Sequence, residues 1–363
     1  MKEYPLRQIL RHFPIVGSVA NIEPLGNGLI NDTYKICTEG DAPDYVLQRI
    51  NHAIFRDVDL LQANIDAVTS HIRKKLEAEG ETDLDRKVLR FIVSDNGKTY
   101  WKEDESYWRV SLFIPRTKTY EAVTPEHSER AGEAFGKFEA MLVDLPEEIG
   151  ETIPDFHNME LRVRQLREAV ANNAARRVDE VKDILSEIEE HADAMCLAEQ
   201  LHRAGKLKKR ICHCDTKVNN MLYDEKGDVL CVIDLDTVMP SYVFSDYGDF
   251  LRTGANKVAE DSPEIDKVEF DMDIFKAFTR GYLRSAGSFL EPVETENLPY
   301  AAALFPFMQC VRFLTDYLNG DTYYKIAYPE HNLVRTQNQL QLFRSVRTHE
   351  AEMRAFIQHL QTV

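Results

Sequence analysis

The sequence predicts an α+β protein with two lobes: a small antiparallel β-sheet lobe over residues 1–115 and a larger, mainly helical lobe over residues 116–363. Segments that alternate polar and apolar residues, separated by turn residues, are concentrated before residue 115. After it, apolar residues recur at the spacing of helices that bury one face. A chain of 363 residues is also long enough to give two lobes their own cores.

The elements of the first lobe follow one another closely. Residues 21–40 alternate in polarity around a Gly-Asn-Gly turn, which predicts a β-hairpin. Residues 42–51 form the next predicted strand. A helix is predicted over residues 58–80, where an apolar stripe ends near a glycine. Residues 87–94 and 106–115 complete the lobe as two further strands joined by an Asn-Gly turn.

The second lobe is predicted to consist mainly of helices. The first begins at Thr124, an N-cap residue followed by proline at the first helical position, and reaches Leu142. A long helical stretch over residues 160–205 is expected to break once. Further helices are predicted after Asp271 and over residues 307–318.

Composition restricts the partners that the chain can have. The net charge of −17 and the pI of about 5.2 disfavour binding to nucleic acid or to anionic membranes, because both carry negative charge. No run of 18 apolar residues occurs, so we expect a cytoplasmic protein without a membrane span. The six cysteines are scattered and do not resemble a disulfide framework or a zinc site. A monomer or a small homo-oligomer is expected.

A polar run over residues 211–237 interrupts the helices. Two short strands flank a turn at residues 224–228, so the hairpin places Asn220 opposite the segment that ends at Asp234. An amide oxygen and a carboxylate side by side are ligands that Mg²⁺ prefers. Asp215 precedes this hairpin and is placed to orient a hydroxyl group. Each residue alone is as well explained as a turn cap, but the set predicts phosphoryl transfer.

The same residues resemble a known superfamily. The pattern His213-x-Asp215-x-x-x-x-Asn220, followed by Ile233-Asp234, resembles the aminoglycoside phosphotransferase and choline kinase superfamily, which has a protein-kinase-like fold. The strings VIDLDTVMP, FSDYGDFLRTGAN, RFLTDYLNGD and YPEHNLVRT resemble its N-acetylhexosamine kinase branch. The resemblance spans residues 20–340. It implies a bilobal kinase-like fold, ATP as co-substrate, Mg²⁺ as cofactor, and phosphorylation of the anomeric hydroxyl of an amino sugar.

The resemblance also implies roles for residues of the polar run. Asp215 is the expected catalytic aspartate, which faces the acceptor hydroxyl. Asn220 and Asp234 are the expected magnesium ligands. His213 and Asp236 are expected to support the catalytic loop, as is Asp249 further along the chain.

On the nucleotide side, the fold implies a glycine turn near the phosphates and a hinge whose backbone binds adenine. The corresponding candidates are Gly26, Gly28, Asn31, Thr33, Gln48, Arg49, Leu112 and Ile114. Kinase-like folds carry a Lys or Arg on the third strand, but Gln48 takes that place here and Arg49 points to the other face. The glycine turn alone is equally typical of an ordinary hairpin, and the hinge of an ordinary edge strand.

On the acceptor side, Arg312 and Asp316 lie four residues apart on a helix and form either an exposed ion pair or a polar rim that binds a sugar. Arg252 and Tyr317 complete the predicted substrate ligands. Other acceptors stay open: choline, an aminoglycoside or a different sugar. Choline is less favoured because an aromatic cage would be needed and both tryptophans fall in the first lobe. A nucleotide-binding scaffold without turnover is a third possibility, which Gln48 mildly supports.

Overall fold

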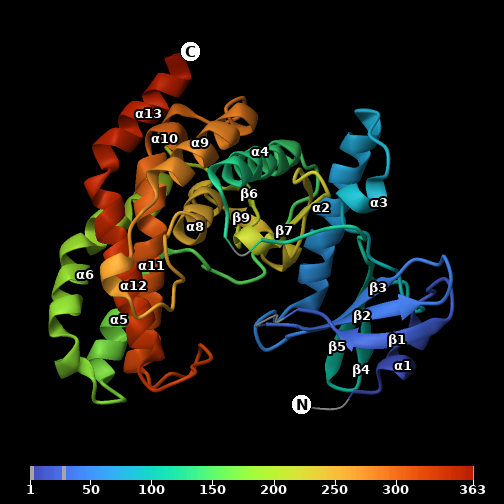
Figure 1. Ribbon diagram of the computed structural model, residues 1–363. Coiled ribbons are helices and arrows are strands. Elements are labelled where there is room, and N and C mark those ends of the chain that lie inside the picture. Colours follow the sequence, from blue (N-terminus) through green and yellow to red (C-terminus); the bar gives the residue numbers. More distant parts are fainter. Residues whose placement is uncertain (1–3, 27–29, 121, 363) are drawn as a thin grey trace. The chain divides into compact units, whose positions relative to one another are not determined.

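The computed structural model describes residues 4–26, 30–120 and 122–362, and confirms the predicted α+β class (Figure 1). Contacts group the chain into two compact units. Unit 1 comprises Met1–Lys118, Asp144–Pro154 and Met221–Met239. Unit 2 comprises Thr119–Val143, Asp155–Asn220 and Pro240–Val363. The roles assigned to the predicted domains, 1–115 for the nucleotide and 116–363 for the acceptor, stay predictions.

Unit 1 is built on a five-stranded antiparallel sheet in the order β1-β2-β3-β5-β4. Its strands are β1 (Val19–Pro24), β2 (Asp32–Thr38), β3 (Tyr45–Ile50), β4 (Trp101–Glu103) and β5 (Ser106–Leu112). The predicted hairpin over residues 21–40 is confirmed as β1 and β2. The predicted strand over residues 87–94 is wrong: only Phe91 forms a β-bridge there, with Ser111, and residues 84–87 are helical.

One face of this sheet packs against a short N-terminal helix, α1 (Leu6–Ile9), through a buried cluster that includes Leu47, Trp108 and Val110. The helices α2 (Val58–Ala78) and α3 (Leu84–Lys87) follow β3. Helix α2 begins at an N-cap, Asp57, whose side chain accepts a hydrogen bond from Leu60 N at 2.9 Å.

Two later segments belong to unit 1 because they hydrogen-bond to the earlier residues. The side chain of Asn64 on α2 donates to the carbonyls of Gly150 and Val238. The hairpin of β7 (Met221–Tyr223) and β8 (Val229–Val232) joins through a bridge between Tyr223 and Lys118. A 3₁₀ turn, η4 (Leu235–Thr237), follows β8. The next strand is β9 (Met239–Ser241).

Unit 2 is mainly helical. Its elements are α4 (Pro125–Leu142), α5 (Met159–Asn172), η2 (Val178–Glu180), α6 (Lys182–Met195), α7 (Leu197–Arg203), β6 (Arg210–Cys212), η3 (Val218–Asn220), α8 (Phe244–Gly254), η5 (Ile265–Lys267), α9 (Met272–Ala286), α10 (Pro292–Glu296), α11 (Leu298–Leu318), α12 (His331–Thr348) and α13 (Glu350–Thr362). Thr124 caps α4 as predicted. The stretch 160–205 breaks more than once, first at Asn173, which adopts a left-handed conformation. Among the described residues, no helix is long and apolar enough to span a membrane.

Helices α4 and α9 pack side by side in unit 2 (Figure 1). Glycines allow this close approach. A Cβ atom on Gly281 would lie 1.9 Å from the Glu129 carbonyl oxygen, and one on Gly132 would lie 2.1 Å from the Phe278 carbonyl oxygen. The contact brings Glu139 of α4 against Tyr282 of α9, beneath the loop that follows β6.

Candidate active site

The loop after β6 is held in place by a buried aspartate on α8. The carboxylate of Asp246, which is fully buried, accepts hydrogen bonds from the backbone N–H groups of His213 and Cys214, both at 2.7 Å. Thr216 Oγ1 donates to the Asp246 carbonyl at 2.7 Å. Cys214 adopts φ +62°, a conformation that costs a non-glycine residue about 1–3 kcal/mol. The bonds to Asp246 offset this strain and thereby fix the residue that follows, Asp215.

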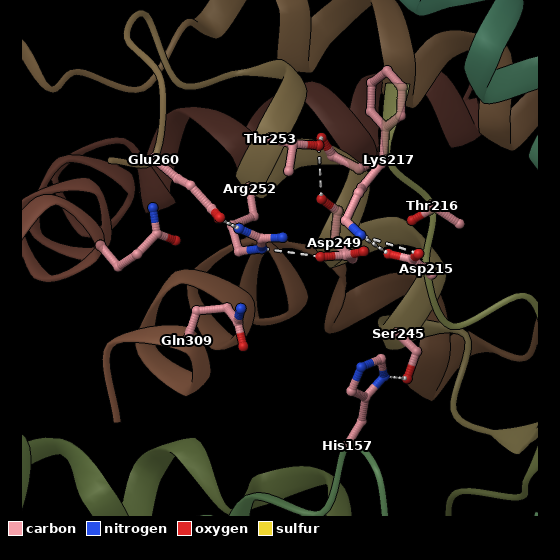
Figure 2. Close-up of polar contacts among 12 residues, drawn as sticks. His157, Asp215, Thr216, Lys217, Ser245, Asp249, Arg252, Thr253, Glu260 and Gln309 are labelled. Atoms are coloured by element: carbon pink, nitrogen blue, oxygen red, sulfur yellow. Dashed lines mark hydrogen bonds and ion pairs between the residues drawn. The ribbon is translucent and has the colours of Figure 1, made fainter. Parts of the chain in front are cut away.

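The Asp215 carboxylate has a cation and an amide as neighbours, Lys217 and Asn220. Figure 2 shows its contact with Lys217. Lys217 Nζ lies 2.8 Å from one carboxylate oxygen and 3.1 Å from the other. Burial opposes ionisation of Asp215, but the charge and hydrogen bonds of Lys217, with a contribution from Asn220, lower its pKa. The group is therefore a carboxylate at neutral pH, able to accept a hydrogen bond from a hydroxyl group.

Asn220 is oriented by the same aspartate. Its Nδ2 atom donates to the Asp215 carbonyl at 2.8 Å and to the Asp215 carboxylate at 3.1 Å. Because both bonds use the amide nitrogen, the amide oxygen points away from Asp215. That oxygen is a hard ligand of the kind that Mg²⁺ binds.

Asp234, the second predicted magnesium ligand, lies two residues beyond β8. The register pairs Met221 with Val232, as the predicted hairpin requires. Asp234 adopts φ +61°, a left-handed conformation that Asp tolerates better than most residues and that recurs at functional sites. Its carboxylate suits Mg²⁺ as the Asn220 oxygen does. The two residues belong to different units, so their joint metal site stays a prediction.

Acidic and basic groups alternate beside Asp215 (Figure 2). Arg252 Nε donates to Asp249 at 2.9 Å, and its Nη1 lies 2.5 Å from a Glu260 oxygen. Burial raises the pKa of Asp249, partly offset by Arg252, and the Lys217 charge also acts on it. The predicted residues Arg252 and Asp249 thus lie beside Asp215. Glu260 completes the group, although no motif in the sequence marks it.

A carboxyl pair lies buried below the loop. Glu139 and Asp246 place carboxyl oxygens within 4.8 Å of one another and of Cys212 Sγ. Tyr282 donates to Glu139 Oε2 at 2.5 Å, whereas Glu139 Oε1 accepts no hydrogen bond from the described residues. Burial raises the pKa of Glu139 well above its usual range, and the Asp246 charge adds to this effect. A proton on Glu139 satisfies the buried oxygen and removes the repulsion between the two groups.

The other predicted substrate ligands have partners within unit 2. Arg312 lies over the rings of Phe156 and Tyr324, at 5.2 and 5.7 Å. The Asp316 carboxylate accepts hydrogen bonds from the backbone of the loop after α11, at Thr322, Tyr323 and Tyr324, and from Asn332. Tyr317 donates to Glu180 at 2.9 Å. These contacts organise the loop and the helix end, and binding of substrate by these residues stays a prediction.

A partly buried histidine near this region has no counterpart in the sequence motifs. His157 Nδ1 lies 3.0 Å from Ser245 Oγ, and Figure 2 shows the two side chains facing each other. Burial, together with the charges of Arg312 and Arg162, lowers the pKa of His157 well below its usual range. The ring is therefore neutral and able to exchange hydrogen bonds with polar groups.

The predicted nucleotide residues lie in unit 1. Gly26 adopts φ +69° and has open space around it, while Gly28 falls outside the described residues. Asn31 donates to Asp236 at 2.7 Å, and the Thr33 hydroxyl accepts from Gln48 at 3.2 Å.

The remaining nucleotide candidates are held by neighbouring residues. Arg49 pairs with Asp32 at 2.6 Å and lies over the Tyr4 ring, on the face predicted for it. In the hinge, the Leu112 N–H donates to the Arg90 carbonyl and the Ile114 carbonyl accepts from Thr117. Adenine binding by this segment stays a prediction.

Known proteins are similar to this chain in sequence family and in fold. The family model described as "Phosphotransferase enzyme family" matches residues 21–286. An aminoglycoside phosphotransferase from Alicyclobacillus acidocaldarius is similar in structure, with a TM-score of 0.64 and 13% identity over 99% of this chain and 98% of that one. A spectinomycin phosphotransferase in complex with ADP and spectinomycin is similar with a TM-score of 0.55 and 14% identity, over 99% of each chain. A choline/ethanolamine kinase family protein from Mesorhizobium loti is similar with a TM-score of 0.56 and 16% identity, over 96% of this chain and 98% of that one. At these identities the likeness is one of fold.

Proposed function

Because the chain belongs to the phosphotransferase enzyme family, we propose that it transfers the γ-phosphoryl group of ATP to a hydroxyl group of a small molecule, with the anomeric hydroxyl of N-acetylglucosamine or N-acetylgalactosamine as the acceptor. The observation that carries the proposal is the loop around Asp215. A carboxylate with a lowered pKa is held there between Lys217 and Asn220 by a strained backbone that α8 stabilises.

The chemistry needs alignment more than covalent participation. Phosphoryl transfer proceeds by in-line displacement, and the protein contributes positioning and charge stabilisation. Asp215 accepts the hydrogen bond of the acceptor hydroxyl and takes its proton as the hydroxyl oxygen bonds to the γ-phosphorus and the bond from that phosphorus to ADP breaks. Lys217, at 2.8 Å, keeps the carboxylate ionised before the reaction.

Asn220 and Asp234 are the residues that would hold Mg²⁺. The amide oxygen of Asn220 points away from Asp215, and Asp234 follows the paired hairpin, so both offer hard oxygen ligands. When bound, Mg²⁺ neutralises charge on the phosphate oxygens. Asn31 and Thr152, which donate to Asp236, hold the turn that carries Asp234.

The pairing of charges around Asp215 favours a neutral, polyhydroxylated acceptor. The carboxylates of Asp215 and Asp249 are each already paired with a cation, Lys217 or Arg252. A cationic acceptor such as choline or an aminoglycoside needs carboxylates that its own charge can pair with. Carboxylate and guanidinium groups in one cluster instead match the paired donors and acceptors of neighbouring sugar hydroxyls. The sequence strings that resemble N-acetylhexosamine kinases point to the same class.

A screen of acceptors tests this proposal. The purified protein is mixed with ATP, Mg²⁺ and single acceptors, namely N-acetylhexosamines, other sugars, choline, ethanolamine and aminoglycosides, and release of ADP is followed. We expect release with an N-acetylhexosamine and an acid-labile phosphate on the product. Release with choline or an aminoglycoside alone would replace the proposed acceptor. Binding of ATP without release for any acceptor would select the scaffold hypothesis.

A further inference from the structure

A buried arginine, Arg109, lies next to the place where the third strand carries Gln48 instead of a cation. The strand register pairs Gln48 of β3 with Arg109 of β5 and with Thr33 of β2. Residues that face one another across neighbouring strands project from the same face of the sheet. Thr33, Gln48 and Arg109 therefore form one row, on the face opposite to that of Arg49.

Hydrogen bonds run along this row and continue to helix α2. Gln48 donates to Thr33 at 3.2 Å and accepts from Arg109 Nε at 3.0 Å. Arg109 Nη1 donates to the side-chain oxygen of Gln62 on α2 at 3.2 Å. Two neutral glutamines, one on the strand and one on the helix, thus flank the guanidinium of Arg109.

The row ends at the turn that follows β8. Arg109 Nη1 lies 2.6 Å from Asp236 Oδ1, and the two side chains are 3% and 4% exposed. The other oxygen of Asp236 accepts from Asn31 at 2.7 Å. Asp236 comes two residues after Asp234, which holds the left-handed conformation at the start of this turn. A carboxylate buried this deeply requires a cation, and Gln48 supplies none.

We infer that Arg109 is a positioning residue of the nucleotide lobe. Through its contact with Asp236 it fixes the turn that presents Asp234 to the metal. Arg109 on β5 thus supplies the positive charge that β3 lacks. The inference rests on the proposed function, because it assigns Asp234 to Mg²⁺. The neutral side chains of Gln48 and Gln62 orient the guanidinium by accepting hydrogen bonds from it. An arginine suits this role because its planar group donates hydrogen bonds to Gln48 and Gln62 at fixed angles while its charge lies beside Asp236.

Three variants test the role of Arg109. Arg109→Met removes the charge with little change of volume, and Arg109→Lys keeps the charge but loses the fork of donors. Arg49→Met removes the neighbouring cation on the opposite face of the sheet. It tests the alternative that Arg49, and not Arg109, replaces the cation missing from β3. The first measurement is hydrogen exchange of the amides in residues 233–238 of nucleotide-free protein. The second is the Mg²⁺ concentration that gives half-maximal binding of ADP.

We expect Arg109→Met to increase exchange over residues 233–238 and to raise the half-saturating Mg²⁺ concentration by about 10- to 100-fold, as losses of outer-shell partners of metal ligands do. Arg109→Lys should recover part of both effects, and Arg49→Met should leave the exchange over residues 233–238 near wild type. Wild-type exchange and Mg²⁺ dependence in Arg109→Met, or a larger increase in exchange in Arg49→Met, would overturn the inference.

The design separates two kinds of failure. If Arg109→Met does not fold, the double variant Arg109→Met/Asp236→Asn removes both charges and leaves no buried carboxylate without a cation. It should fold and still show the raised exchange and Mg²⁺ requirement, whereas a merely structural pair would give wild-type values. If the wild-type protein binds no ADP with Mg²⁺, the proposed function fails, and the exchange measurement alone still decides whether Arg109 holds the turn.

Discussion

Replacing Asp215 by asparagine should separate catalysis from folding and from nucleotide binding. The substitution keeps the shape of the side chain and removes its charge. The ion pair with Lys217 is lost, but an amide oxygen remains that can accept a hydrogen bond from Lys217 or from Asn220. The hydrogen bonds that the backbone N–H groups of His213 and Cys214 donate to Asp246 do not involve the Asp215 side chain, so the loop should keep its conformation.

The structure indicates the size of each effect. The side chains of Lys217 and Asp215 are 43% and 19% exposed, and such a partly exposed pair contributes only about 0.2–1 kcal/mol to folding. A positioned carboxylate base contributes about 10²- to 10⁴-fold in rate, which corresponds to ~2.7–5.5 kcal/mol in the activation free energy. The loss of turnover should therefore exceed the loss of stability several-fold in free energy.

The assay compares the turnover number, the dissociation constant for ADP with Mg²⁺, and the free energy of unfolding in urea. We expect turnover to fall by orders of magnitude while the other two quantities change little. Asp271→Asn is the matched control, since asparagine caps a helix as well as aspartate does and the same charge is lost at α9. Turnover in Asp215→Asn equal to that of the control would remove Asp215 from the mechanism.

Three further predictions concern the framework of the site. Glu139→Gln should remove the pH dependence that Glu139 gives to folding. Because the pKa of Glu139 is raised in the folded protein, its stabilising contribution is fully present below the unfolded pKa, near 4.5. This contribution is lost as pH rises through the folded pKa, by at most ~1.4 kcal/mol per pH unit. Urea unfolding across this range should show the wild-type advantage shrinking with pH, and a constant difference would argue against the protonated pair. Gly281→Ala should lower stability by about 1–3 kcal/mol through overpacking against Glu129, despite a gain of about 1 kcal/mol in helix propensity; unchanged thermal unfolding would contradict the close packing of α4 and α9. Asp316→Asn should cost about 1–3 kcal/mol and increase hydrogen exchange over residues 322–324, because these amides lose a charged acceptor; an effect on acceptor KM alone would instead support direct binding of substrate.

Local patterns in the sequence predicted the parts of the site that depend on short segments. The hairpin register that pairs Met221 with Val232 follows from two apolar runs and a turn. The N-cap at Thr124 follows from the threonine and the proline after it. The opposite faces of Gln48 and Arg49 follow from the alternation of side chains along a strand.

Local sequence patterns did not predict the contacts between segments that lie far apart in the chain. Arg109 and Asp236 lie far apart in the chain, and nothing in the composition of either segment marks their pairing. Asp316 is spaced like an ion-pair partner of Arg312, yet its carboxylate accepts hydrogen bonds from the backbone of the loop after α11, which spacing along one helix does not reveal. The break at Asn173 depends on a left-handed conformation that helical periodicity does not reveal.

Phosphorus–proton NMR of the reaction product tests most directly whether the protein phosphorylates the anomeric hydroxyl. The wild-type protein is incubated with ATP, Mg²⁺ and N-acetylglucosamine or N-acetylgalactosamine, and the coupling of the new phosphorus signal to the sugar protons is measured. We expect coupling to the anomeric proton, and no new signal over the same time when Asp215→Asn replaces the wild type. Coupling to a proton at any other carbon, or ATP that stays intact with both sugars, would contradict this expectation.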